Sequence, residues 1–160
     1  MRLCILLLLI PAAVSAAQSA PSASRNDVDR SFAAAESLMK AGKVADAAQA
    51  FEHITHLRPD FAEAYFALGV SYAQLGKPEE AAAALRSYLK LEPQSPDGHA
   101  VLGILLFDNR RIAEARPELE QAVRLDRLQS EAAKHLGRVY NLEGNAAKAV
   151  ALLRPLVASG

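Results

Sequence analysis

The 160-residue sequence contains one cysteine and no tryptophan, and its formal net charge at pH 7 is zero. Because Cys4 is the only cysteine, the chain has no internal disulfide and must rely on a packed core for stability. Charge is balanced and no long run of like charges occurs, so nothing in the composition indicates nucleic-acid binding. We therefore expect a small globular protein that does not bind nucleic acid.

The common catalytic motifs are also missing. There is no Gly-rich phosphate loop, no Gly-x-Ser-x-Gly and no catalytic-cysteine signature. His53 and His56 lie three residues apart and could supply half of a metal site on a helix, but the His-Glu-x-x-His order of zinc proteases is absent. Solvated surface histidines are the simpler interpretation, and a metal-dependent activity is the weaker alternative. We predict a protein without enzymatic activity and without a cofactor.

Long apolar runs are scarce, and the most continuous one lies near the N-terminus. Leu3–Ile10 is uninterrupted and apolar, with Arg2 before it and Pro11 after it. A helix that spans a bilayer needs about 20 such residues. A positive start, a short apolar segment and small residues at the ends of Val14-Ser15-Ala16 are instead typical of a signal peptide. The sequence therefore predicts a signal peptide over residues 1–16.

Cleavage after Ala17 or Ala20, and an uncleaved anchor, are the alternatives to cleavage after Ala16. Cys4 lies inside the apolar run rather than after it, so the chain does not resemble a lipoprotein. Residues 17–27 are predicted to be a flexible leader, since their first part is small, polar and proline-containing. We expect an exported protein, periplasmic or secreted and most consistent with a bacterium, with no stable membrane insertion after cleavage. A eukaryotic secretory location is the alternative.

The stretch Ala62–Pro93 predicts two helices folded against each other. Asp60 is a suitable N-cap, and Glu63 three residues later completes a capping box. Gly76 suits the C-terminal end of the first helix, and Pro78 suits the first position of the second. The final proline closes that helix, because the residue before a proline is pushed out of the α region. The unit is a helical hairpin.

The same hairpin recurs at a step of 34 residues. Three sets of positions keep this step: a Leu-Gly pair, an alanine and a large apolar residue. They are Leu68-Gly69, Leu102-Gly103 and Leu136-Gly137; Ala47, Ala81, Ala115 and Ala149; and Phe51, Leu85, Leu119 and Leu153. A helix-turn-helix repeated at this period resembles the tetratricopeptide repeat (TPR) family.

The resemblance is strongest in the second unit, where Tyr65, Leu68-Gly69, Tyr72, Ala81, Leu85 and Pro93 follow the family pattern. The first unit departs most, with Ala34-Ala35 in place of Leu-Gly, and the third has Arg127 where proline is expected. The resemblance implies an all-α fold, a right-handed superhelical array of about four hairpins known as an α-solenoid. The predicted repeats are 28–61, 62–95, 96–129 and 130–160.

Two local features carry further predictions. A glycine in a helix interior costs roughly 1 kcal/mol against alanine, so Gly69, Gly103 and Gly137 predict a close approach by a neighbouring helix. Pro117 and Pro155 fall inside predicted second helices, and each removes one intrahelical hydrogen bond. We expect a kink or a late helix start at each proline.

The resemblance implies that the first helix of each repeat turns one face to the inside of the superhelix, where TPR proteins hold their partners. Helical spacing selects the residues of this inner face, and the two middle helices are apolar nearly all round. A carboxylate clamp is not supported, because apolar side chains replace the polar set in the second unit. The predicted residues that bind a partner protein or peptide are Phe32, Phe66, Val70, Ile104, Phe107, Lys134 and Arg138.

Two alternatives to a foreign partner on the inner face remain open. The first is that the leader or a second copy of the chain covers this face. The second concerns the C-terminal repeat. Val150, Leu153, Leu156 and Val157 could also form an exposed apolar edge, since terminal repeats normally need a polar outer face. The alternative function is therefore a self-associating module of a larger envelope complex, with a homodimer formed through this repeat.

Overall fold

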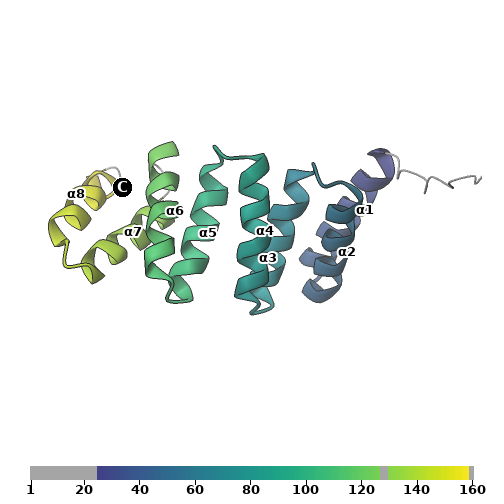
Figure 1. Ribbon diagram of the computed structural model, residues 1–160, viewed down its shortest axis with the longest axis horizontal. Coiled ribbons are helices and arrows are strands. Elements are labelled where there is room, and N and C mark those ends of the chain that lie inside the picture. The colour runs from purple at the N-terminus through teal and green to yellow at the C-terminus, as the bar shows by residue number, and fades with distance from the viewer. Residues whose placement is uncertain (1–24, 127–129, 159–160) are drawn as a thin grey trace, which may run out of the picture.

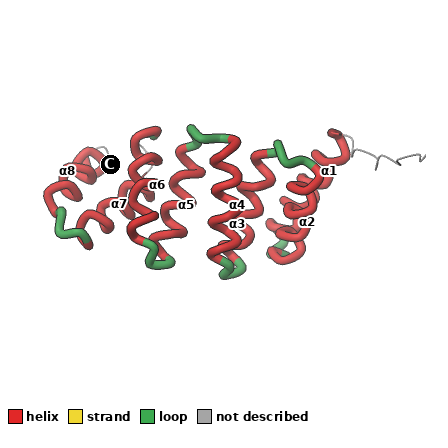
Figure 2. The backbone as a smooth tube through the Cα atoms, viewed as in Figure 1, coloured by secondary structure: helices red, strands yellow, loops and turns green. Residues whose placement is uncertain are grey.

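The computed structural model describes residues 25–126 and 130–158. The predicted signal peptide and Cys4 lie outside the described residues. Within them the secondary structure is entirely helical, as Figure 2 shows. The helices are α1 (Arg25–Lys40), α2 (Val44–Leu57), α3 (Ala62–Gln74), α4 (Pro78–Leu91), α5 (Pro96–Asp108), α6 (Ile112–Leu125), α7 (Ser130–Leu142) and α8 (Ala146–Ala158).

Consecutive helices pair into hairpins, α1 with α2, α3 with α4, α5 with α6 and α7 with α8. The second helix of each hairpin also packs against the first helix of the next one. The hairpins follow one another along the long axis of the molecule, with α1 and α2 at one end and α8 at the other (Figure 1). The predicted fold class, an all-α solenoid of helical hairpins, is confirmed.

Each hairpin turns through one residue in the left-handed region. That residue is Gly42, Gly76 or Gly144, with φ between 68° and 75°, but in the third hairpin it is Arg110, with φ 63°. The next residue donates its N–H to the carbonyl five positions earlier, for example Lys77 to Tyr72 at 2.9 Å. This is the Schellman arrangement that ends many helices. Gly76 therefore ends α3 as predicted, and the third turn forms without glycine.

The Leu-Gly pairs permit the close approach that the sequence predicts. A Cβ added to Gly69 or to Gly103 would lie 2.7 Å from the Cγ of a leucine on the second helix, which is closer than real Cβ atoms come. These leucines are Leu85 and Leu119. A Cβ on Gly137 would lie 3.0 Å from Leu153. In the second, third and fourth hairpins the two helices can thus touch because this position lacks a side chain, and in the first hairpin the equivalent residue is the small, fully buried Ala35.

The predicted capping box at Asp60 is wrong. α3 begins at Ala62, its N-cap residue is Phe61, and no side chain caps it. The Asp60 carboxylate instead accepts two hydrogen bonds from the Arg58 guanidinium, at 3.0 and 3.4 Å. A bidentate bond to a charged donor is stronger than a bond to a neutral backbone N–H, so Arg58 holds the carboxylate away from the helix. Pro78 does occupy the first position of α4, as predicted.

Helix α6 continues through Pro117 from Ile112 to Leu125, so the alternative of a late start is wrong there. Pro117 lies five residues after Ile112 and is exposed, so the carbonyl that loses its N–H partner lies on the solvent side of the helix. α8 likewise continues through Pro155. α1 begins at Arg25, within the stretch predicted as leader.

The buried side chains form two cores. The N-terminal core joins α1, α2, α3 and part of α4, and its largest member is Phe51, which is 1% exposed. The C-terminal core joins α4, α5, α6 and α7 around Leu85, Leu102 and Leu119. Successive hairpins are therefore held together by shared cores, and they place the first helices α1, α3, α5 and α7 as neighbours.

Candidate partner-binding face

Side chains of neighbouring first helices meet at two points. Between α1 and α3, the Ser71 hydroxyl oxygen lies 3.2 Å from the Met39 sulfur. Between α5 and α7, the rings of Phe107 and His135 meet edge to face, with centroids 5.3 Å apart. Side chains of the first helices thus join α1 to α3 and α5 to α7.

Phe32 on α1 belongs to the N-terminal core. Its ring centroid lies 5.4 Å from that of Phe51 on α2 and 5.1 Å from that of Phe61, just before α3. Tilted aromatic pairs at this distance contribute beyond their buried area. Phe32 is half-buried, so one side of the ring stabilises the first junction and the rest is accessible.

Phe66, Ile104 and Phe107 all pack against the C-terminal core and are half-buried. Val70 on α3 is half-buried as well. The structure therefore brings three of the predicted apolar residues to the margin of one core, on α3 and α5. Phe32 lies apart from them, with the other core.

Sequence reasoning missed Tyr88 of α4. Its ring centroid lies 5.1 Å from that of Phe66, and its hydroxyl donates to the Ser95 hydroxyl at 2.9 Å. Ser95 in turn accepts the Gly98 N–H at 3.1 Å and caps α5. A Cβ on Gly98 would lie 2.6 Å from the tyrosine ring. Tyr88 thus supports Phe66 from behind while it positions the start of α5.

The 34-residue step could have revealed this pair. At the other two junctions between hairpins, the residues equivalent to Tyr88 are Ile54 and Ala122, and those equivalent to Gly98 are Ala64 and Ala132. The largest side chain at one position therefore coincides with the smallest at the other. This compensation is visible in the sequence once the repeats are aligned.

The predicted basic residues lie exposed on α7. Lys134 donates to Glu131 at 2.7 Å, and this hydrogen bond lowers the pKa of the Glu131 carboxyl, with His135 and Arg138 adding weaker attraction. Arg138 lies exposed on the same helix. Arg138 is therefore a cation that an incoming carboxylate can reach.

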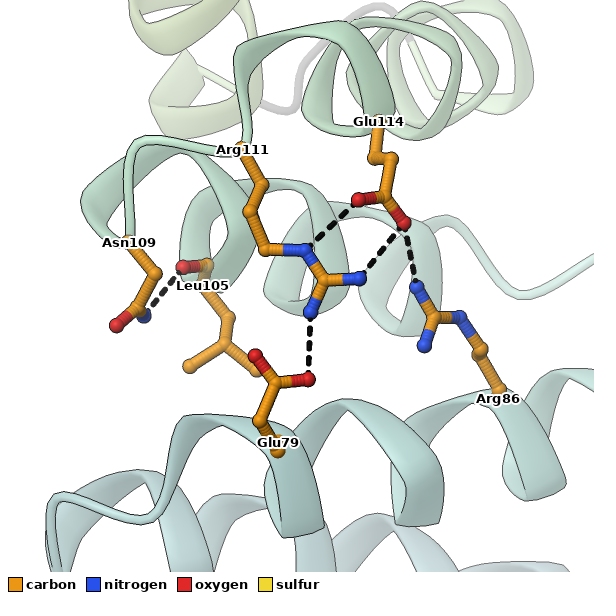
Figure 3. A network of polar contacts seen from close by, with 6 residues as sticks. All are labelled: Glu79, Arg86, Leu105, Asn109, Arg111 and Glu114. Carbon is orange, nitrogen blue, oxygen red and sulfur yellow. Dashed lines mark hydrogen bonds and ion pairs between the residues drawn. The ribbon is translucent and has the colours of Figure 1, made fainter.

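A polar network joins the second and third hairpins on another surface. The Arg111 guanidinium donates to Glu114 on α6 and to Glu79 at the start of α4, with both distances 2.8 Å (Figure 3). Arg86 on α4 also donates to Glu114, at 3.0 Å. The hydrogen bond from Arg111 is the main reason why the pKa of Glu114 lies below its ordinary value. The network ties two repeats together at their surface.

The histidines have separate surroundings. His53 and His56 are exposed on α2, whereas His99 Nδ1 lies 2.7 Å from the Glu118 carboxylate. Among residues 25–126 and 130–158, no three His, Cys, Asp or Glu side chains are grouped so that they could hold a metal ion. The described helices also include none that is long and apolar enough to cross a bilayer.

The predicted C-terminal edge is partly described. Val150 on α8 is 57% exposed, Leu153 is half-buried, and Leu142 at the end of α7 is 67% exposed. The side chains of Leu156 and Val157 lie outside the described residues.

A family model described as Tetratricopeptide repeat matches residues 32–96 and 101–160, more than half of the chain. No curated protein matches the chain. A solved structure of MamA from Desulfovibrio magneticus RS-1 is 18% identical with a TM-score of 0.75, over 84% of this chain and 76% of that one.

Two further similar structures contain peptides. The Yersinia enterocolitica type III secretion chaperone SycD, solved with a peptide of the translocator YopD, is 17% identical with a TM-score of 0.72, over 75% of this chain and 97% of that one. The first TPR of Spaghetti (RPAP3), solved with the HSP90 peptide SRMEEVD, is 15% identical with a TM-score of 0.72, over 78% and 99% of the two chains. At these identities the likeness concerns the fold.

Proposed function

Because the chain belongs to the tetratricopeptide repeat family, we propose that it is an exported scaffold that binds a peptide or protein segment on its inner face. The observation that carries the proposal is that Phe66, Ile104 and Phe107 on α3 and α5 are half-buried at the margin of one core, while Arg138 is exposed on α7, the next first helix. Apolar side chains anchor a partner, and a neighbouring cation selects an acidic group on it. Similar TPR structures contain a YopD peptide and an HSP90 peptide, which supports this class of ligand.

The proposal contains no catalytic step, no cofactor and no nucleic acid. The partner contacts Phe32, Phe66, Val70, Ile104 and Phe107 through apolar groups, and Lys134 and Arg138 through acidic ones. Lys134 already binds Glu131, so Arg138 is the stronger attraction for a carboxylate.

Binding is tested with peptides selected from a random display library on the wild-type chain. The double variant Phe66→Glu with Phe107→Glu should weaken the selected peptides at least about tenfold, because two charges enter the contact surface. The matched control is Leu57→Glu with Leu91→Glu, which adds the same charge at exposed apolar positions on α2 and α4. Undiminished binding by a folded double variant would count against the inner face.

A second variant tests the same face in case the first variant does not fold. Lys134 and Arg138 are exposed, so Lys134→Glu with Arg138→Glu leaves the cores intact. We expect this charge reversal to weaken acidic peptides selectively, with a smaller effect at high salt. Equal weakening of acidic and neutral peptides would contradict the role given to Arg138.

Export is tested by the mass of the chain after expression in a bacterium. Cleavage after Ala16, Ala17 or Ala20 removes the apolar segment, and the shortened chain should be recovered from the periplasm or medium. Recovery of the intact chain from the cytosol would refute this part of the proposal.

The second candidate function is self-association, as a module of a larger envelope complex. It is favoured by Val150 and Leu142, which leave apolar surface exposed in the fourth hairpin. Such surface marks contact with another molecule more often than an isolated exposed leucine does.

A further inference from the structure

His135 lies on α7 between the two basic residues of the predicted partner-binding set. Lys134 precedes it, and Arg138 follows three residues later, so His135 and Arg138 are neighbours on one side of the helix. The imidazole is half-buried, and its ring meets that of Phe107 edge to face, with centroids 5.3 Å apart. His135 therefore joins an apolar residue of the set on α5 to the basic residues on α7.

A hydrogen bond decides which ring nitrogen of His135 gains or loses a proton. Nδ1 lies 2.9 Å from the carbonyl oxygen of Glu131, one turn earlier in the helix. A carbonyl oxygen only accepts hydrogen bonds, so Nδ1 carries its proton whether the ring is neutral or charged. Nε2 is therefore the nitrogen that titrates. It is an acceptor in the neutral ring and a donor in the charged ring.

We propose that His135 is a specificity-determining residue of the inner face, and that its charged imidazole binds a carboxylate of the partner together with Arg138. The inference rests on the first proposed function and adds a pH dependence to it. The charged ring donates from Nε2, and a hydrogen bond between charged groups is stronger than one between neutral groups. The neutral ring presents a lone pair instead, so the carboxylate then loses this bond and keeps only its attraction to the basic residues.

The acidic residue of α7 is bound mainly by another side chain. Lys134 donates to the Glu131 carboxylate at 2.7 Å. This bond is the main reason why the pKa of Glu131 lies below its ordinary value, and the charges of His135 and Arg138 attract the carboxylate more weakly. An acidic partner therefore meets His135 and Arg138 as the two groups that Glu131 engages least.

Helices α5, α6 and α8 pack against α7. From α5, the uncharged ring of Phe107 meets the imidazole, and the next residue, Asp108, is exposed. His99 of α5 lies 2.7 Å from Glu118 of α6. The charged side chains that α6 and α8 direct toward α7 contact Tyr140 or Glu143, and they are Arg116, Glu120 and Lys148. Among these titratable groups, His135 is the one that contacts an apolar residue of the predicted set.

Binding of an acidic segment should therefore strengthen as the pH falls through the range in which imidazoles titrate, about pH 8 to 6. Carboxyl groups in peptides ordinarily have a pKa of about 4, so they remain charged over this range. The affinity should rise at least about threefold, a modest factor because the site is partly solvated. A segment without carboxylates should bind equally well at both ends of the range.

The test selects random peptides by display on the wild-type chain at about pH 6 and at about pH 8 in parallel. Asp and Glu should be enriched among the peptides selected at the lower pH. His135→Gln keeps an amide N–H for the Glu131 carbonyl but cannot titrate, so this enrichment should vanish. His53→Gln, at an exposed histidine of α2, is the matched control and should retain it.

Proton uptake on binding distinguishes a direct role of His135 from a structural one. Binding and protonation are reciprocal, so a peptide that prefers the charged imidazole should take up protons when it binds at about pH 7. Calorimetry of one selected acidic peptide in two buffers with different enthalpies of ionisation measures this uptake. Wild type and His53→Gln should show it, and His135→Gln should not. The same peptide with its acids replaced by amides should bind all three chains alike, which also shows that the variant face is intact.

The outcomes separate the role of His135 from the function on which it rests. Peptides equally rich in acids at both pH values, a preference that a folded His135→Gln retains, or no proton uptake by wild type would overturn the role while peptide binding stands. Selection of no peptide at either pH would remove both. A pH preference and a proton uptake that only His135→Gln loses support the inference.

Discussion

The two halves of the molecule join successive hairpins by different means. In the N-terminal half, the rings of Phe32, Phe51 and Phe61 meet at the first junction, and the surface ion pair of Arg58 with Asp60 stays within one turn. In the C-terminal half the buried core consists of leucine, alanine and Val139, and ion pairs cross from one hairpin to the next. The first junction therefore depends on apolar stacking, and the later ones on apolar packing with electrostatic support.

The comparison shows which positions of the repeat require a small residue and which accept different side chains. A small residue must face the second helix within each hairpin, as at Gly69, Gly103 and Gly137. The contact between hairpins can be made by different side chains as long as it is buried. The following substitutions test this division, beginning with the largest expected effect.

A substitution in one core should destabilise that core and leave the other intact. Phe51→Ala removes a ring that is 1% exposed and should cost about 3–5 kcal/mol of unfolding free energy, and Leu119→Ala about 2–5 kcal/mol. Because repeats contact only their neighbours, hydrogen exchange should rise in α1–α3 for the first variant and in α4–α7 for the second. Leu57→Ala, at a residue that is 44% exposed, is the control and should cost less than about 0.5 kcal/mol. Equal loss of protection along the whole chain would show one cooperative unit instead.

Gly103→Ala should destabilise the third hairpin despite the better helix propensity of alanine. The added methyl would lie 2.7 Å from Leu119, and such overpacking costs about 1–3 kcal/mol against a gain of about 1. In a Leu119→Ala background the two side-chain contacts are removed and the contact with the backbone N of residue 119, at 3.1 Å, stays, so the same substitution should cost less than it does in the wild type. Chemical denaturation of wild type, the two single variants and the double variant measures this coupling. Additive changes in unfolding free energy would contradict the packing explanation.

Arg110→Gly should stabilise the protein by up to about 1 kcal/mol, because a non-glycine residue in the left-handed region carries a steric cost. Gly76→Ala is the reciprocal control. Its φ is +68° and an added Cβ would meet nothing within 4 Å, so any loss reflects backbone conformation alone. If Arg110→Gly lowers stability instead, the arginine side chain makes a contribution that outweighs the strain.

The smallest effect should come from the ion-pair network in Figure 3. The pKa of Glu114 is lowered chiefly by the hydrogen bond from Arg111, so its contribution to stability is present above the ordinary carboxyl pKa and is lost as pH falls below about 4. Glu114→Gln should therefore melt earlier than wild type at pH 7, by a margin that shrinks toward pH 3 and in high salt. A margin that is independent of pH would argue that packing of the side chain, rather than its charge, is responsible.

Much of the fold could be predicted from the sequence, because the 34-residue step and the turn glycines are local signals. The N-cap of α3 could not, because Arg58 competes for Asp60 and the sequence does not tell which bond forms. At the candidate site, the spacing selects Phe66, Ile104 and Phe107. It does not show that Tyr88 lies against Phe66 or that His135 lies against Phe107, because these contacts join different helices.

The repeat alone therefore determines that the chain forms helical hairpins, where each hairpin turns and where two helices must touch. These features depend on residues close in the chain, on backbone preference and on the absence of a side chain. Tertiary structure decides which faces are covered. Val150 and Ala82 hold equivalent places in the repeat, yet one is 57% exposed and the other fully buried. The reason is that burial depends on the neighbouring hairpin, which a periodic sequence pattern does not contain.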